Sequence, residues 1–235
     1  MKIMKIMSFN TQHCLNFIEG KIDFELMAQT IKNCGADIVG LNEIRDKGES
    51  SEYAPQASIL SSLTGLEHFY FAKAIDVNGP NPYGNALLSK YKITEAITVP
   101  VPDPNPRQYD GFYETRCLLK AKLEGGITIM VIHFGLNPDE QINAVNTVIE
   151  NLENEKCILM GDFNVRPDDK VLAPIRSRMK DCADKFEREL LSYPSDNPDR
   201  KIDYIFVSPD VEICEADIPN IVASDHRPHT ATVIL

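Results

Sequence analysis

Polar residues with catalytic potential repeatedly stand at the ends of apolar segments of this chain. Asn10 ends one such segment, Glu43 a second and His133 a third, and Asp162 and Asn164 follow a fourth. Charged groups at the ends of buried strands are costly unless they are paired or bound to a metal. Strand ends are also where open α/β sheets place their sites. We therefore expect these side chains to meet at one edge of a sheet.

The residue types suit hydrolysis assisted by a divalent cation. Glu43 and Asn10 offer oxygen ligands of the kind that Mg²⁺ prefers. Asp162 and Asn164 flank Phe163, so in an extended segment their side chains point the same way and can hold one water between them. Each signal is ambiguous alone, because Glu43 could be a solvated loop acid and the GDFN sequence could be a turn.

The C-terminal region adds an imidazole and a possible acid to orient it. Asp225 and His226 place a carboxylate beside an imidazole, although such a dipeptide is also common in surface turns. Asp203 lies inside the apolar segment 202–207, where a carboxylate needs a partner. Orienting a protonated histidine is a standard role for such a group. Asp203 is therefore predicted to hold His226.

Composition limits the class of protein. The 235 residues are 43% hydrophobic, enough for a real core, and we expect residues 1–235 to form a single domain. No stretch approaches the ~18 continuous apolar residues of a membrane helix, and the N-terminus lacks the features of a signal peptide. We expect no membrane insertion and, by default, a cytoplasmic location. The six cysteines form no CxxC pair and are predicted to be small buried hydrophobic residues.

The charge balance bears on the partner. The formal net charge is −11, whereas proteins that bind nucleic acid usually carry a basic face. A local basic patch remains possible, because net charge averages over the surface. The balance therefore favours a small phosphorylated substrate over a long nucleic acid, which stays possible, and it leaves the oligomeric state open.

Apolar periodicity and turn residues predict an α/β fold in which strands outnumber helices. Helices are predicted over 24–33, 55–63 and 138–153, with Gly35 and Gly65 ending the first two. Two sheets packed together with helices outside is one natural arrangement of this pattern, among other α/β layouts. The proline-containing loops 76–83 and 100–111 are candidate rims for a site. Strands are predicted over 5–10, 37–41, 68–75, 85–89, 93–99, 116–123, 127–133, 157–160, 202–207, 211–218 and 229–235.

Taken together and in this order, the motifs resemble the endonuclease/exonuclease/phosphatase superfamily. That superfamily includes deoxyribonuclease-like nucleases, apurinic endonucleases, inositol-polyphosphate 5-phosphatases and bacterial sphingomyelinases. The resemblance runs from Asn10 to His229. The matching segments are SFNTQ (8–12), LNEIRD (41–46), YGNALLSK (83–90), ETR (114–116), VIHFGL (131–136), GDFN (161–164), KIDYIFVS (201–208) and SDHRP (224–228).

The resemblance implies a four-layered α/β sandwich of two mostly antiparallel sheets flanked by helices. It implies that Glu43 is the principal Mg²⁺ ligand, supported by Asn10 and Asp225, with Mn²⁺ as a possible substitute. It also implies that Asp162 positions and deprotonates the attacking water, while Asn164 holds that water or a phosphate oxygen.

The same resemblance assigns the groups around the phosphate. It implies that His226, oriented by Asp203, contacts the scissile phosphate and that His133 lies near the leaving group. Tyr83 and Arg116 match supporting or phosphate-binding positions. Hydrolysis of a phosphate ester depends mainly on positioning and charge neutralisation, so one metal with cationic imidazoles facing an in-line water is sufficient. The number of metals and the residue that takes the proton from the water are left open.

Some positions depart from the family pattern or have two interpretations. Asn42 stands where many relatives carry glutamine before the glutamate, a shorter amide that could alter the geometry around it. Arg45 could contact a nucleic-acid groove or form a surface ion pair. Arg116 and Arg166 are candidates to bind a small phosphate in a narrow pocket.

Three functions follow from these observations. The leading hypothesis is a Mg²⁺-dependent hydrolase that cleaves a small or modest phosphoester by in-line attack of an activated water. The alternative is a Mg²⁺-dependent deoxyribonuclease-like endo- or exonuclease. A remote third possibility is a catalytically inactive binding module that keeps the fold without the chemistry.

Overall fold

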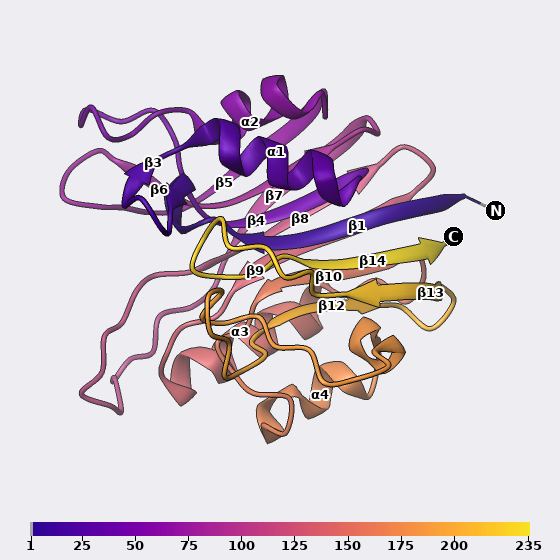
Figure 1. Ribbon diagram of the computed structural model, residues 1–235. Helices are drawn as coiled ribbons and strands as arrows, with labels where there is room; N and C mark the ends of the chain where they lie inside the picture. Colours follow the sequence, from indigo (N-terminus) through magenta and orange to yellow (C-terminus); the bar gives the residue numbers. More distant parts are fainter. Residues whose placement is uncertain (1) are drawn as a thin grey trace.

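The computed structural model describes residues 2–235 and contains two six-stranded sheets packed against each other (Figure 1). In the first sheet β1 and β4 are parallel and all other neighbours are antiparallel. Its strands, in spatial order, are β13 (Glu212–Asp217), β14 (His229–Ile234), β1 (Ile3–Asn10), β4 (Ile38–Arg45), β6 (Pro82–Ser89) and β5 (His68–Asp76).

The second sheet follows the same plan, with one parallel pair, β9 and β10, among antiparallel neighbours. Its strands, in spatial order, are β11 (Lys180–Asp181), β12 (Asp203–Val207), β10 (Cys157–Asp162), β9 (Ile127–His133), β8 (Cys117–Leu123) and β7 (Ile93–Pro100). A separate two-stranded ribbon joins β2 (Leu15–Asn16) and β3 (Lys21–Ile22).

Helices cover the outer face of each sheet (Figure 1). The first sheet carries α1 (Phe24–Cys34) and α2 (Gln56–Thr64), and the second carries α3 (Pro138–Asn151) and the short α4 (Ala173–Arg176). Three 3₁₀ turns span Gln12–Cys14, Lys170–Leu172 and Cys182–Lys185. None of the helices within residues 2–235 is both long and apolar enough to cross a membrane.

Local sequence signals explain where the main helices begin and end. The Asp23 side chain accepts a hydrogen bond from the Leu26 amide at 2.9 Å and so caps the start of α1. Gly35 ends α1 with φ of 64°, a left-handed conformation that glycine adopts at little cost. Asn137 and Glu140 form a capping box at the start of α3, with proline at the first helical position.

Alternating side chains on the central strands produce three apolar layers. Met4 and Ile6 of β1 pack between the two sheets, whereas Met7 and Phe9 pack under α1 and α2. On β10 the side chains alternate in the same way between the sheets and the layer beneath α3. Burying one such side chain contributes roughly 1.5–3 kcal/mol. Two sheets with two helical layers outside them confirm the expected four-layered α/β sandwich.

The structure corrects several predicted boundaries. The strand expected over 85–89 begins at Pro82, so Tyr83 belongs to β6 and the preceding loop is shorter than predicted. Proline is tolerated at the first residue of a strand, which explains why its presence did not end the pairing. The short elements β11 and α4 were not predicted, because two to four residues give too little periodicity to detect. The loop predicted over 100–111 instead spans 101–116, and the strand predicted from Arg116 begins at Cys117.

Candidate active site

Most of the residues singled out in the sequence line one cavity of about 430 Å³ at the ends of the central strands. Asn10 and Asp203 do not line this cavity but contact side chains that do. The predicted residues in its lining are Glu43, Tyr83, Arg116, His133, Asp162, Asn164, Asp225 and His226.

A bulge in β4 turns Glu43 toward the cavity. The register between β4 and β6 shifts between Leu41 and Ile44, and Glu43 adopts φ of 59°. This bulge removes Glu43 from the regular pairing of the sheet and re-aims its side chain. The Asn10 amide nitrogen then donates to Glu43 Oε1 at 3.0 Å and to Asp162 Oδ2 at 3.1 Å. Asn10 therefore links the carboxylates of the two sheets.

Asn42 connects the two sheets directly beneath the cavity. Its amide nitrogen donates to the Ile132 carbonyl at 2.9 Å and to Asn85 Oδ1 at 2.8 Å, and its oxygen accepts from the Asp162 amide at 2.9 Å. The side chain has 0% exposure. The shorter amide, noted as a departure in the sequence, thus spans from β4 to both β9 and β10. The role of Asn85 was not predicted.

The GDFN segment ends strand β10 and leaves the extended conformation at Asn164, so the prediction that it is extended throughout is wrong. Gly161 has φ of 148°, and a Cβ atom there would lie 1.8 Å from the Ile132 carbonyl oxygen, so only glycine fits. Asn164 has φ of 52°, and its amide donates to Asp162 Oδ1 at 2.9 Å. Both side chains nevertheless approach His133, which lies 3.2 Å from Asn164 and 3.5 Å from Asp162.

His226 is held between two buried carboxylates. Its Nδ1 lies 2.9 Å from Asp203 Oδ2 and its Nε2 lies 3.5 Å from Asp162 Oδ2. Burial alone would lower the pKa of His226, but the negative charges of Asp203 and Asp162 outweigh it and raise that pKa to about 10. Burial raises the pKa of Asp162 to about 7, against the attraction of the His226 charge. His226 is therefore a cation at neutral pH.

His133 is the neutral imidazole of the site, so the expectation of two cationic imidazoles is wrong. Its pKa is lowered well below the ordinary value by burial, by the Arg116 guanidinium and by the charge of His226. Arg116 NH1 lies 3.1 Å from His133 Nδ1. A guanidinium can only donate, so a neutral His133 accepts at Nδ1 and carries its proton on Nε2. The Asn164 amide nitrogen, 3.2 Å from that Nε2, donates instead to the Phe134 carbonyl at 3.0 Å. The Nε2 proton faces the side of the cavity that contains Asp162.

The arginines of the cavity differ in part from those expected. Arg116 lines it and forms an ion pair with Glu114 at 2.5 Å. Arg166 does not line it, and its guanidinium instead donates to the Asp199 carbonyl at 3.2 Å. Arg200, which the sequence analysis missed, lines the cavity and pairs with Asp199 at 2.5 Å.

An aromatic wall was also missed. The Tyr193 ring centroid lies 4.7 Å from that of His226 and 5.4 Å from the Arg200 guanidinium carbon. Tyr193 and Arg200 flank a polar, proline-containing segment without periodicity, so no sequence pattern marked them. Arg45 lies outside the lining, over the Tyr53 ring and 3.7 Å from Glu52, which supports the surface ion pair rather than the groove contact.

Two groups of side chains have the chemistry of metal ligands. One oxygen or nitrogen from each of Asp162, Asp203 and His226 lies within 4.8 Å of the others, but these groups are buried and already paired with one another. Glu43 and Asp225 both reach the cavity. Burial raises the pKa of Asp225, and the charge of Glu43 raises it further against the effect of His226. Within residues 2–235, Glu43 has no cationic side chain within 4.0 Å.

Comparisons with known proteins bear on the family and on the fold. Residues 7–226 match the model of the Endonuclease/Exonuclease/phosphatase family. A comparison with functionally curated proteins gave no match.

Solved structures resemble the chain over nearly its whole length. An endonuclease/exonuclease/phosphatase from Beutenbergia cavernae is 19% identical with a TM-score of 0.81, covering 100% of this chain and 72% of that one. A second, from Bacteroides vulgatus, is 20% identical with a TM-score of 0.76 and covers 100% of both chains. A mannosyl-6-phosphatase from Bacteroides thetaiotaomicron is 15% identical with a TM-score of 0.77, covering 99% of this chain and 100% of that one. The TM-scores show a shared fold, and at these low sequence identities the likeness shows the fold alone.

Proposed function

The chain belongs to the endonuclease/exonuclease/phosphatase family, and from this premise we propose that it is a divalent-cation-dependent hydrolase that cleaves a small phosphoester. The reaction is in-line attack on phosphorus by an activated water. The observation that carries the proposal is the convergence of Glu43, Asp162 and His226 on one cavity of about 430 Å³. Phosphoester hydrolysis needs such positioning and charge neutralisation more than covalent chemistry.

Asp162 is the general base in this proposal. A general base works best when its pKa is close to the operating pH, and burial raises the pKa of Asp162 to about 7. His226 cannot take the proton at neutral pH, because its pKa is raised to about 10 by the two carboxylates beside it. Asn164, whose amide nitrogen lies 3.2 Å from His133, is placed to hold the water or a phosphate oxygen.

The remaining side chains stabilise the phosphate and the leaving group. The His226 imidazolium, held by Asp203 at 2.9 Å, faces the negative charge that builds up on the phosphate oxygens. Neutral His133 carries its proton on the nitrogen that faces the cavity and can give a hydrogen bond to the leaving oxygen. Arg116 fixes this tautomer and adds a positive charge beside it. Tyr83 completes the wall next to Glu43.

Glu43, Asp225 and the Asn10 amide oxygen would hold the cation. Carboxylate and amide oxygens suit Mg²⁺, with Mn²⁺ as a substitute. The Asn10 oxygen accepts from the Gln12 amide at 3.0 Å, and an amide oxygen has a second lone pair available. The charge of Glu43 raises the pKa of Asp225, and within residues 2–235 Glu43 has no cationic side chain within 4.0 Å, so this pair of carboxylates fits such an ion. When bound, the cation neutralises the phosphate and polarises the bond that breaks.

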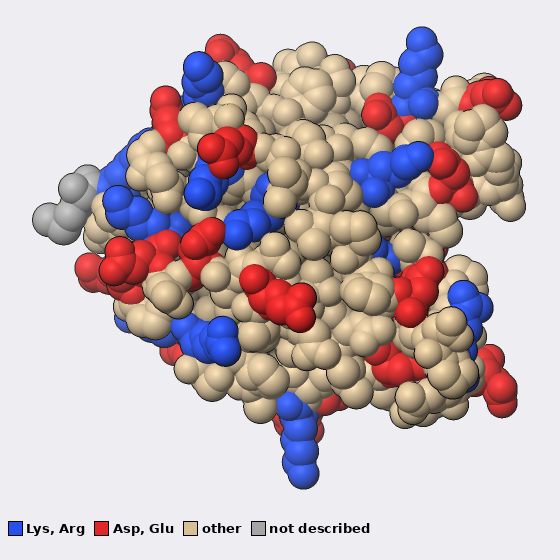
Figure 2. Space-filling view, turned by 180° about the vertical axis from the view of Figure 1, so that it is seen from behind, with Lys and Arg blue, Asp and Glu red and all other residues tan. Residues whose placement is uncertain are grey.

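The charges around the cavity favour a small substrate over a polynucleotide. The cationic side chains Arg116 and Arg200 are each already paired with an acid. On the face of the molecule that Figure 2 shows, Lys and Arg side chains are interspersed with Asp and Glu side chains. A polynucleotide is bound through many phosphate contacts. A neighbouring structure is a mannosyl-6-phosphatase, which supports a phosphomonoester as the substrate.

A substrate panel tests the proposal. The purified protein is assayed with Mg²⁺ or Mn²⁺ on a hexose 6-phosphate, on bis(p-nitrophenyl) phosphate and on supercoiled plasmid. We expect turnover of a small ester that EDTA abolishes and added Mg²⁺ restores. Plasmid nicking that weakens steeply with salt, without turnover of the small esters, would show a nuclease instead. If no ester is turned over while calorimetry shows that the metal binds, the protein is a binding module.

A further inference from the structure

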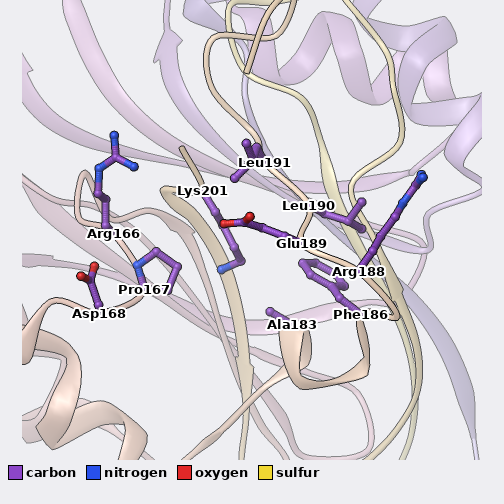
Figure 3. A pocket seen from close by; sticks show the side chains of 10 residues that line it. All are labelled: Arg166, Pro167, Asp168, Ala183, Phe186, Arg188, Glu189, Leu190, Leu191 and Lys201. Atoms are coloured by element: carbon purple, nitrogen blue, oxygen red, sulfur yellow. The ribbon is translucent and has the colours of Figure 1, made fainter. Parts of the chain in front are cut away.

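A second cavity, of about 580 Å³, lies beside the candidate active site and shares none of its lining residues. Figure 3 shows its walls, which come from the segment 166–168, from the loop that contains Phe186 and Leu190, and from Lys201. Cavities of roughly 300–1,000 Å³ are typical of small-molecule sites. The function proposed above does not use this cavity.

The two cavities are separated by a wall of two chain segments. In the first segment Asn164 lines the active-site cavity and Arg166 lines the second one. In the other segment Ile202 lines the active-site cavity and Lys201 lines the second one. The segments are joined by a hydrogen bond from the Phe163 amide to the Ile202 carbonyl at 2.9 Å. One side of the second cavity is therefore formed by segments that adjoin the strand ends carrying the catalytic groups.

Lys201 is a buried cation without a counter-ion. The residue is 5% exposed, and its Nζ has no hydrogen-bond partner. Within residues 2–235, no carboxylate oxygen lies within 4.0 Å of Nζ. The amine instead lies 3.3 Å from the centroid of the Tyr204 ring. In Figure 3 it is directed to the space between Pro167 and Ala183. A buried charge in this state is costly unless an anion joins it.

Burial lowers the pKa of Lys201 to about 8, although the charges of Asp181 and Asp203 oppose this change. The amine therefore remains mostly protonated at pH 7. Asp181 does not neutralise it by direct contact, because its carboxylate is bound by Arg176 at 3.0 Å and by the Ala183 amide at 2.9 Å.

Among the described residues that line the cavity, Lys201 is the one buried charged side chain. Arg166, Arg188, Asp168 and Glu189 also line it, but all four are exposed, and in Figure 3 the Arg188 side chain is directed away from Lys201. Apolar side chains, among them Phe186, cover the wall next to these charges. We propose that the second cavity binds a small organic anion, with its charged group near Lys201 and its apolar part against the Phe186 ring.

Isothermal titration calorimetry with 2-naphthoate tests this site, with neutral 2-naphthalenemethanol as the matched probe. We expect 2-naphthoate to bind the wild-type protein with a Kd of about 1 mM or tighter and the alcohol to bind at least about tenfold more weakly. Lys201→Met should weaken naphthoate binding about tenfold or more, and the cavity-filling Ala183→Phe should abolish it. Circular dichroism establishes that both variants are folded.

Two further variants locate the binding and keep the test decisive. Lys170→Met, which removes an exposed lysine outside the cavity, and Arg116→Gln, in the active site, should leave naphthoate affinity unchanged. If Lys201→Met does not fold, Ala183→Phe decides alone. The proposal is wrong if wild-type protein shows no heat with 10 mM naphthoate, about ten times the expected Kd, if the Lys201→Met and Ala183→Phe variants bind it as well as the wild type does, or if Arg116→Gln abolishes binding.

Discussion

The candidate active site and the cavity beside Lys201 share a wall, but they stabilise their buried charges differently. In the active site, His226 lies within 3.5 Å of two carboxylates, and Asp162 is also reached by the Asn10 amide and by His133. In the second cavity, Lys201 has only an aromatic ring beside its amine. Both sites use charged groups that the sequence places at or near the ends of apolar strands.

This difference separates two ways in which a fold can use a buried charge. A charged group that its neighbours orient and neutralise is ready to act on a bound substrate, because no reorganisation is needed. A charged group without a partner destabilises the protein until a ligand of opposite charge arrives. Substitution of a paired charged group in the active site should therefore lower turnover. Substitution of the unpaired Lys201 should raise the free energy of unfolding.

The largest effect is expected from variants of the active site, where the buried charged groups are paired with one another. Asp162→Asn removes the proposed base, and His226→Ala removes the imidazolium that faces the phosphate. Each should lower turnover of the best small ester by ~10²-fold or more while leaving the fold intact. Asp184→Asn, an exposed aspartate outside the active-site cavity, is the control and should keep wild-type turnover. Full activity in either active-site variant would show that the catalytic residues are misassigned.

The comparison also shows which parts of the fold the sequence could predict. The long strands and α1 to α3 were found, because alternating apolar residues such as Met4 to Phe9 and capping residues such as Asp23 and Gly35 act within a few positions of one another. The strand order was not found from periodicity, because pairing between β1 and β14 joins the two ends of the chain. The family resemblance supplied the layered arrangement.

The site was predictable where single residues carry recognisable chemistry. Glu43, His133 and Asp162 stand out at strand ends, and the structure brings them to one cavity. Arg200 was missed because nothing in its local sequence tells which arginine turns toward the cavity. The neutral state of His133 was missed for a related reason. A pKa depends on burial and on charges from other segments, and neither can be read from neighbouring residues.

A second effect is expected from Asn42, the residue that connects the two sheets beneath the active site. Asn42→Ala removes three buried hydrogen bonds, two that tie β4 to β9 and β10 and one to Asn85 of β6, and leaves their partners unsatisfied. The free energy of unfolding should fall by about 3 kcal/mol, and turnover should fall because the Asp162 backbone is no longer fixed. Urea unfolding and the substrate assay measure the two effects. Asn33→Ala, at an exposed position of α1, is the control. Unchanged stability would mean that the sheets are positioned without this link.

A third, smaller effect has the opposite sign. Lys201→Met removes the unpaired buried charge and should raise the free energy of unfolding at pH 7 by about 2 kcal/mol, less than the pKa shift alone implies because the contact with Tyr204 is also lost. Below about pH 8 the wild-type amine is protonated in both states, so the cost of burial is fully present. Between this pKa and 10.5, the unfolded state binds more protons, and wild-type stability rises with pH.

The difference in the free energy of unfolding between Lys201→Met and the wild type should therefore shrink as the pH rises from 8 toward 10.5. Titration of His226 changes stability in the same pH range with the opposite sign, but it is common to both proteins and cancels in the difference. Urea unfolding of both proteins at several pH values measures this difference in the free energy of unfolding. A difference that stays constant with pH, or a Met variant less stable than wild type at pH 7, would show that Lys201 is already neutralised inside the protein.

The smallest effect is expected from Cys157, which lies outside both cavities and serves as a reference. Cys157 is fully buried at the start of β10, and its sulfur lies 3.8 Å from that of Met130. Cys157→Ala should lower the free energy of unfolding by about 1 kcal/mol, because the lost sulfur leaves a small cavity in the layer beneath α3. Turnover and naphthoate affinity should not change, because the site lies at the other end of the strand. Cys214→Ala, at an exposed position, should change neither quantity. A loss of turnover in Cys157→Ala greater than its loss of stability explains would mean that packing at the far end of β10 reaches Asp162, and that the active site is less rigid than its hydrogen bonds imply.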